Sequence, residues 1–189
     1  MAFLHLLALL PFSFFQAQTS VLMPEFHTPL HLIYLTSQMI GSDRSDATIA
    51  EFSKRGGNMI VFDIQDSNAH LAFSSKLPLS IELDNRKDQI TSLRETVRKL
   101  HDKGYYVVAR YVLFKNGFLA KRKPEWTLKR KGTNQTFMSR DGPIWLDPGN
   151  TELGEYLIDI AREIAFSGVD EIQFDYVRFP EAGKGGVIG

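Results

Sequence analysis

A chain of 189 residues in which 43% are hydrophobic is long enough to bury the core of one domain and too short for two. Its 22 basic and 22 acidic side chains cancel, which argues against a surface built to attract nucleic acid or an anionic membrane. We therefore expect one domain with no nucleic-acid partner.

The first residues predict export from the cell. Met1 to Phe15 is almost wholly apolar, and the small and polar residues from Gln16 to Ser20 resemble a cleavage zone. Pro11 and the short apolar length oppose a membrane-spanning helix. We expect a signal peptide at residues 1–18, a linker at 19–30 and the folded domain at 31–189. The mature protein would then lack a stable membrane span and be secreted or lie in the periplasm or cell envelope.

Beyond the linker, short apolar runs alternate with longer segments of helical period. Strands are expected at His31–Thr36, Asn58–Ile64, Tyr105–Leu113 and Glu171–Val177, and helices at Asp46–Arg55, Arg86–Lys103 and Thr151–Phe166. Gly56-Gly57, Gly104 and Gly168 follow these helices, where a left-handed C-terminal cap favours glycine. Asn150 is well placed as the N-cap of the last helix. This order predicts an α/β fold with parallel strands in about four βα units.

Either an open doubly wound sheet or part of a barrel has this order. Counting by twos places polar residues on one face of three strands: Val61, Asp63 and Gln65; Val108, Arg110 and Val112; Gln173 and Asp175. Apolar residues occupy the opposite faces and suit packing against helices. A polar mouth favours a (β/α)8 TIM-type barrel, and because a complete one needs about 250 residues, we expect a partial barrel.

If the strands are neighbours in sequence order, Arg110 lies between Asp63 and Asp175. An arginine there favours the ionised form of both carboxyl groups, which suits a nucleophile or charge stabiliser and not a general acid. For Asp63 with Arg110, a structural ion-pair network is an equal alternative.

The run from Asp170 to Pro180, DEIQFDYVRFP, resembles the fourth-strand motif of a glycoside hydrolase domain family found in exported bacterial proteins. Further stretches agree in order and spacing, namely IYLTS from Ile33, VFDIQD from Val61, ARYVLFK from Ala109 and WLDP from Trp145. Such families are similar to α-amylase-like barrels, in which a carboxylate ending the fourth strand is the nucleophile. The resemblance gives Asp175 that role and covers only the N-terminal half of the family's domain. A partner acid would come from a later strand.

Glycoside hydrolysis generally needs two carboxyl groups, and we expect Asp175 and Asp63 as catalytic residues acting on a polysaccharide or oligosaccharide. Asp63 or Asp66 as the acid is a weaker alternative, because a neighbouring cation disfavours a protonated carboxyl. The expected substrate-binding residues are Arg110, Arg178, Trp145, Asp147, Tyr176, Gln173 and Asp66. Trp145 is equally suited to core packing, and Asp147-Pro148 also reads as a turn.

The segment from Lys115 to Lys131 holds seven basic residues and one acid. A solvated surface is the simplest interpretation, and attraction to an anionic polysaccharide is an intermediate one. The five histidines are scattered and there is no cysteine, so we expect no metal and no cofactor.

The alternative to an enzyme is a non-catalytic carbohydrate-binding or structural module, or a truncated inactive fragment. An exposed sheet edge would then favour self-association.

Overall fold

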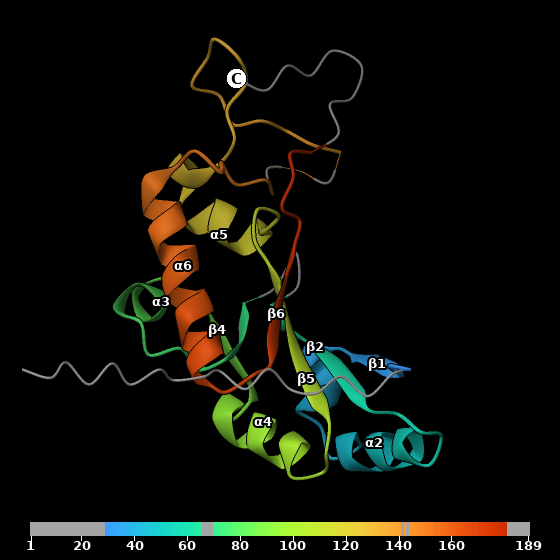
Figure 1. Ribbon diagram of the computed structural model, residues 1–189. Helices are drawn as coiled ribbons and strands as arrows, with labels where there is room; N and C mark the ends of the chain where they lie inside the picture. Colours follow the sequence, from blue (N-terminus) through green and yellow to red (C-terminus); the bar gives the residue numbers. More distant parts are fainter. Residues whose placement is uncertain (1–28, 66–69, 141, 143, 181–189) are drawn as a thin grey trace, which may run out of the picture.

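Four parallel strands form the main sheet of the protein in this computed structural model (Figure 1). They are β1 (Leu32–Leu35), β2 (Met59–Gln65), β5 (Tyr106–Val112) and β6 (Glu171–Asp175), hydrogen-bonded in that order. The structure describes residues 29–65, 70–140, 142 and 144–180, so the expected signal peptide and the linker up to residue 28 lie outside it. The four predicted strands and their parallel order are confirmed, and the architecture is a partial (β/α)8 barrel.

A second, two-stranded sheet corrects the predicted helix Arg86–Lys103. Its strands are β3 (Leu71–Phe73) and β4 (Arg86–Ile90), which pair in parallel. The helix begins only at Leu93, because the Ser92 hydroxyl accepts a hydrogen bond from the Glu95 amide at 3.3 Å and so caps α4 (Leu93–His101). The polar sequence of β4 gave no apolar alternation, and its strand conformation depends on β3.

Helices pack against the sheet, and others lie near the two ends of its strands. They are α1 (Ser37–Ile40), α2 (Ser45–Ser53), α3 (Pro78–Glu82), α4, α5 (Gly117–Arg122), the 3₁₀ turn η1 (Pro124–Trp126) and α6 (Thr151–Phe166). Figure 1 shows α2 and α4 near the start of β5, with α5 beyond the carboxyl ends of β5 and β6. No helix in the described ranges has the length and apolar character needed to cross a membrane.

The caps predicted at Asn150 and at the glycines after the helices are confirmed. The Leu153 amide donates to the Asn150 side chain at 2.9 Å, so Asn150 is the N-cap of α6. Gly56, Gly104 and Gly168 follow α2, α4 and α6 with φ of 78°, 82° and 98°. This left-handed conformation costs glycine little because it has no Cβ.

The main core lies between the sheet and the helices. Its fully buried strand residues are Ile60, Phe62, Ile64, Val107, Ala109 and Tyr111, and the helices contribute Leu153, Ile160 and Ile164 among others. On the opposite face of the sheet, Met59, Val61 and Val108 form a separate small cluster. The apolar rows predicted to face the helices on β2 and β5 are therefore confirmed.

One predicted face is only partly correct. Asp63 is aligned with Arg110, but the register shifts before the next pair, and Gln65 is aligned with Tyr111 in place of Val112. Tyr111 belongs to the helix-facing core. A bulge adds one residue to one strand, so strict alternation fails beyond Asp63 and Gln65 does not continue the row of Val61 and Asp63.

The chain between β5 and α6 forms a small unit of its own at the carboxyl ends of the strands. Antiparallel bridges join Lys115 to Trp145, Thr127 to Leu146 and Lys129 to Thr136. Its interior contains Leu128, Phe137, Ile144 and Trp145, against which Tyr176 packs. Through this cluster, Tyr176 in the chain after β6 contacts the segment that leads into α6.

We expect Gly41→Ala to destabilise the protein by about 3 kcal/mol, at the upper end of the cost of overpacking. Gly41 caps the C-terminus of α1, and an added Cβ would lie 1.8 Å from the backbone oxygen of Gln89 in β4. Because this contact is with backbone, no side-chain rotation relieves it. Urea unfolding measures the change, and a loss under about 0.5 kcal/mol would show that α1 and β4 separate easily.

We expect Gly154→Ala, in contrast, to stabilise the protein. Gly154 lies inside α6, and an added Cβ would meet no atom within 4 Å. Alanine loses less backbone entropy than glycine in a helix, so the free energy of unfolding should rise by about 0.5–1 kcal/mol. Thermal unfolding of both alanine variants compares the two sites, and a lower midpoint for Gly154→Ala would contradict the open environment of this position.

Candidate active site

Arg110 joins the two carboxylates that the sequence analysis singled out. Its Nη1 donates to Asp63 Oδ1 at 2.6 Å, and its Nε and Nη2 donate to Asp175 Oδ2 at 3.0 and 2.5 Å. The three residues lie on the neighbouring strands β2, β5 and β6, and Asp175 is the last residue of its strand. The predicted position of Arg110 between the two acids is confirmed. Burial disfavours the charged form of Arg110, but its hydrogen bonds and ion pairs with the two acids outweigh burial and raise its pKa, so Arg110 stays positively charged.

Asp63 is held by protein donors on both oxygens. Oδ1 accepts from Arg110, and Oδ2 accepts a hydrogen bond from the Tyr34 hydroxyl of β1. The Asp63 side chain is only 5% exposed. Little of this carboxylate is left for a substrate, and its contacts are those of a group that orients Arg110.

Tyr34 belongs to this site although sequence reasoning missed it. Burial and then its bond to Asp63 raise the pKa of Tyr34 to about 12, so its hydroxyl stays protonated and donates. The signal available in the sequence was strand alternation, because Tyr34 aligns with Val61 and therefore shares the face of Asp63.

Asp175 is the accessible carboxylate of the pair. Its side chain is 42% exposed, and its Oδ1 accepts a hydrogen bond from the Tyr176 amide at 2.6 Å. Burial disfavours its charge, but the hydrogen bonds from Arg110 and from the Tyr176 backbone outweigh burial and hold its pKa below the usual value. An ionised, oriented and accessible carboxylate can act as a nucleophile, a base or a stabiliser of positive charge.

Tyr176 is fixed in an unusual backbone conformation directly after Asp175. Its φ is 53°, in the left-handed region that costs a residue with a Cβ about 1–3 kcal/mol. The Tyr176 ring packs edge-on against Trp145 with centroids 5.9 Å apart. The Arg178 guanidinium carbon lies 5.6 Å from the Tyr176 centroid and 5.5 Å from that of Trp145. Such strain is maintained where the surroundings specify one conformation, and here it sets both the Tyr176 ring and the amide that binds Asp175.

The remaining predicted residues are spread more widely. Gln173 is exposed and aligned with Arg110 across the sheet. Trp145 is only 6% exposed and belongs to the small cluster between β5 and α6. Asp147 lies in the turn before α6, where its Oδ1 accepts from the Gly149 amide at 2.9 Å. Asp66 lies outside the described residues.

The basic segment from Lys115 to Lys131 has several of its charges paired within the protein. Lys123 forms ion pairs with Glu152 and Glu125 at 3.1 and 3.6 Å. Lys129 donates to the backbone oxygen of Pro124 at 2.7 Å. Among the described residues, no three His, Cys, Asp or Glu side chains gather to hold a metal ion.

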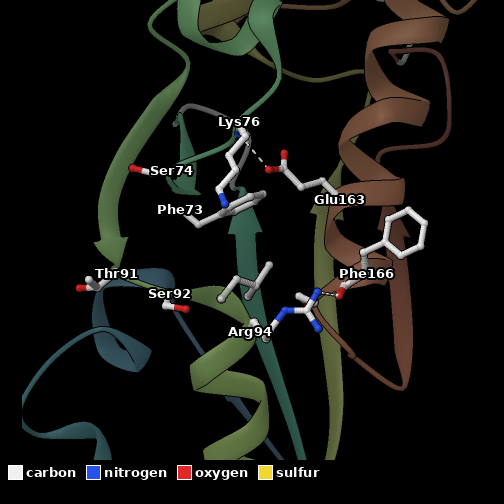
Figure 2. Close-up of a pocket in the computed structure, with 10 residues that line it drawn as sticks. Phe73, Ser74, Lys76, Thr91, Ser92, Arg94, Glu163 and Phe166 are labelled. Carbon is white, nitrogen blue, oxygen red and sulfur yellow. Dashed lines mark hydrogen bonds between the residues drawn. The ribbon is translucent and has the colours of Figure 1, made fainter.

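A separate pocket of about 410 Å³ lies between the end of β3, the start of α4 and the last turns of α6 (Figure 2). Glu163 accepts from the Lys76 amide at 2.9 Å, and Arg94 Nη2 donates to the Phe166 oxygen at 2.5 Å. None of the predicted site residues lines this pocket. These contacts join α6 to the loop after β3 and to the first turn of α4.

Solved structures share this fold. A hypothetical protein from Ruminiclostridium thermocellum is 33% identical, with a TM-score of 0.73 over 79% of this chain and 78% of that one. A noncanonic maltogenic α-amylase from Thermotoga neapolitana is 17% identical, with a TM-score of 0.52 over 81% of this chain and 40% of its own. A chitobiase from Flavobacterium johnsoniae is 14% identical, with a TM-score of 0.56 over 77% of this chain and 23% of its own.

The two enzymes therefore share the fold with this chain, which spans less than half the length of either. No curated protein matches the chain. A family model described as "Putative glycosyl hydrolase domain" matches residues 32–187. The resemblance inferred from the motifs is confirmed, and this chain belongs to that family of glycosyl hydrolase domains.

Proposed function

We propose that this domain hydrolyses glycosidic bonds of a polysaccharide with Asp175 as its working carboxylate. The observation that carries the proposal is the state of Asp175, which is charged, accessible and oriented by Arg110 and by the Tyr176 amide. An ionised carboxylate at the carboxyl end of a barrel strand suits attack on a sugar carbon or stabilisation of an oxocarbenium-like transition state.

Asp63 acts in this proposal through Arg110 and not on the sugar. Its two oxygens accept from Arg110 and Tyr34, and its side chain is nearly buried. It is a positioning residue that, with Tyr34, fixes the guanidinium against Asp175.

Substrate contacts are proposed for the groups around the mouth. Tyr176 directly follows Asp175, and the exposed Gln173 lies two residues before it. Trp145 is mostly buried and supports the Tyr176 ring, while Asp147 and Asp66 remain predicted contacts.

The general acid would come from beyond the two edge strands of the sheet. In the described part of the chain, β1 and β6 each pair with one strand of the main sheet. Leu32 and Phe174 on these strands are about half exposed. Open edges with apolar side chains favour self-association, so a second copy can supply a carboxyl group across the mouth. Light scattering over a concentration series tests this association.

Export is part of the proposal. The apolar segment at residues 1–18 supports it, and a polysaccharide outside the cell would then be the substrate. N-terminal sequencing of the mature protein after expression in a bacterial host tests the predicted cleavage.

The second candidate is a carbohydrate-binding module without turnover. The ion pair between Asp63 and Arg110 favours this candidate, because neither of the two paired groups can supply a proton to a leaving group.

The deciding experiment measures reducing-end release and binding on the same panel of soluble polysaccharides, with Asp175→Asn as the matched control. Release by the native chain that disappears in the variant supports hydrolysis by Asp175. Binding without release supports the module, and release that survives in the variant overturns the role of Asp175.

A further inference from the structure

Arg178 lies over two aromatic rings at the mouth of the site. Its guanidinium carbon lies within 5.6 Å of the centroids of both Trp145 and Tyr176. Trp145 is anchored in the small cluster with Leu128 and Phe137. Stacking on aromatic faces restricts an arginine side chain before any ligand arrives.

The charge of Arg178 is not neutralised by any acid in the described ranges. Its side-chain hydrogen bond there runs from Nη1 to the oxygen of the next residue, Phe179, at a long 3.4 Å. No carboxylate of the described residues lies within 4.0 Å of its nitrogens. Arg110 differs in this respect, because all three of its nitrogens donate to Asp63 and Asp175.

A second cation lies beside the same ring. Lys115 Nζ is 5.0 Å from the Tyr176 centroid. The positive charge of Arg178 also reaches Asp175 and favours its ionised form, although less than the bonds from Arg110 do. The residue that follows the candidate nucleophile is thus flanked by two positive charges.

We propose that Arg178 binds the carboxylate of an acidic sugar, so that the substrate of this site is an anionic polysaccharide built from uronic acids or similar carboxylated units. The inference rests on the proposed function, since it names the substrate class of that site. A guanidinium presents two parallel N–H donors that match a carboxylate, and these charge-assisted bonds are stronger than bonds to sugar hydroxyls. Because the rings already orient Arg178, little further ordering is needed on binding.

Oligogalacturonides and their methyl esters provide matched probes, since they have the same backbone and differ in charge. Isothermal titration calorimetry with the full chain should show at least about tenfold tighter binding of the acid form, the effect of one charge-assisted interaction. In Arg178→Gln this preference should fall to about twofold or less while ester binding stays the same. Arg178→Lys should retain part of this preference, because lysine keeps the positive charge but lacks the two parallel N–H donors of the guanidinium.

Arg86→Gln is the control variant, because Arg86 is an exposed arginine at the start of β4 and takes no part in the site. It should bind both probes like the native chain, and circular dichroism confirms that each variant is folded. Equal affinity of the native chain for acid and ester, or no binding of the acid, would overturn the proposal. So would an unchanged preference in folded Arg178→Gln.

Reducing-end release from the same probes separates this inference from the proposed function. Acid-selective binding through Arg178 without release supports the recognition of a carboxylate and contradicts hydrolysis. Release from neutral polysaccharides that does not depend on Arg178 supports hydrolysis and contradicts the anionic substrate.

Discussion

Asp175→Asn is expected to lower kcat for polysaccharide hydrolysis by at least about a thousandfold, which corresponds to about 4 kcal/mol of transition-state stabilisation. Asparagine keeps the size of the side chain and can still accept a hydrogen bond, but it has no negative charge for a positively charged sugar carbon. The affinity for oligosaccharide should change only a few fold, because the aromatic and polar groups of the mouth remain. Initial rates together with calorimetry separate the two effects.

The matched variant is Asp175→Glu, which keeps the charge and displaces it by one methylene. It should retain more activity than asparagine, since charge matters more than position if the carboxylate is the working group. Equal losses in both variants would instead point to a structural role for the hydrogen bonds of Asp175.

The pH dependence of this site follows from the direction of the Asp175 shift. Because Arg110 and the Tyr176 amide hold its folded-state pKa below the unfolded value, the carboxylate contributes stability above the unfolded value of about 3.9, which is lost as pH falls through the folded pKa. If hydrolysis needs the ionised Asp175, the activity should persist as the pH falls to about the unfolded-state pKa of this carboxyl group.

Arg110→Met is expected to lower the free energy of unfolding by about 3 kcal/mol. Asp63 is 5% exposed and would lose its cationic partner, and removing one member of a buried ion pair typically costs about 3–5 kcal/mol. Arg110 itself is 19% exposed, which places the expectation at the lower end. Urea unfolding measures the shift of the midpoint at constant slope.

Two variants show whether the loss arises from the uncompensated charge. Arg98→Met removes an arginine that also pairs with two acids, Glu95 and Asp102, but is 58% exposed, and it should destabilise the protein far less because solvent screens these pairs. The double variant Asp63→Leu with Arg110→Met should recover much of the lost stability, because no buried charge is then left unpaired. A double variant as unstable as the sum of its two single changes would show that packing, and not charge, is lost.

The local sequence was sufficient for the main strands, for the caps at Asn150 and at the glycines after the helices, and for the row of Asp63, Arg110 and Asp175. These features depend on alternation by two, on a cap such as Asn150 and on neighbouring parallel strands, all of which act over a few residues or follow from strand order. The family resemblance rested on the same strand-end motifs.

The tertiary structure alone decided the features that depend on contacts between distant parts of the chain. β4 is a strand because β3 lies beside it, and Tyr34 belongs to the site because its hydroxyl reaches Asp63, 29 residues further along the chain. The bulge after Asp63 moved Gln65 out of the polar row. The sequence by itself therefore determined which residues share a strand face, since that follows from backbone period. The tertiary structure determined which of their donors are already paired, because hydrogen bonds and ion pairs depend on distances that no local pattern records.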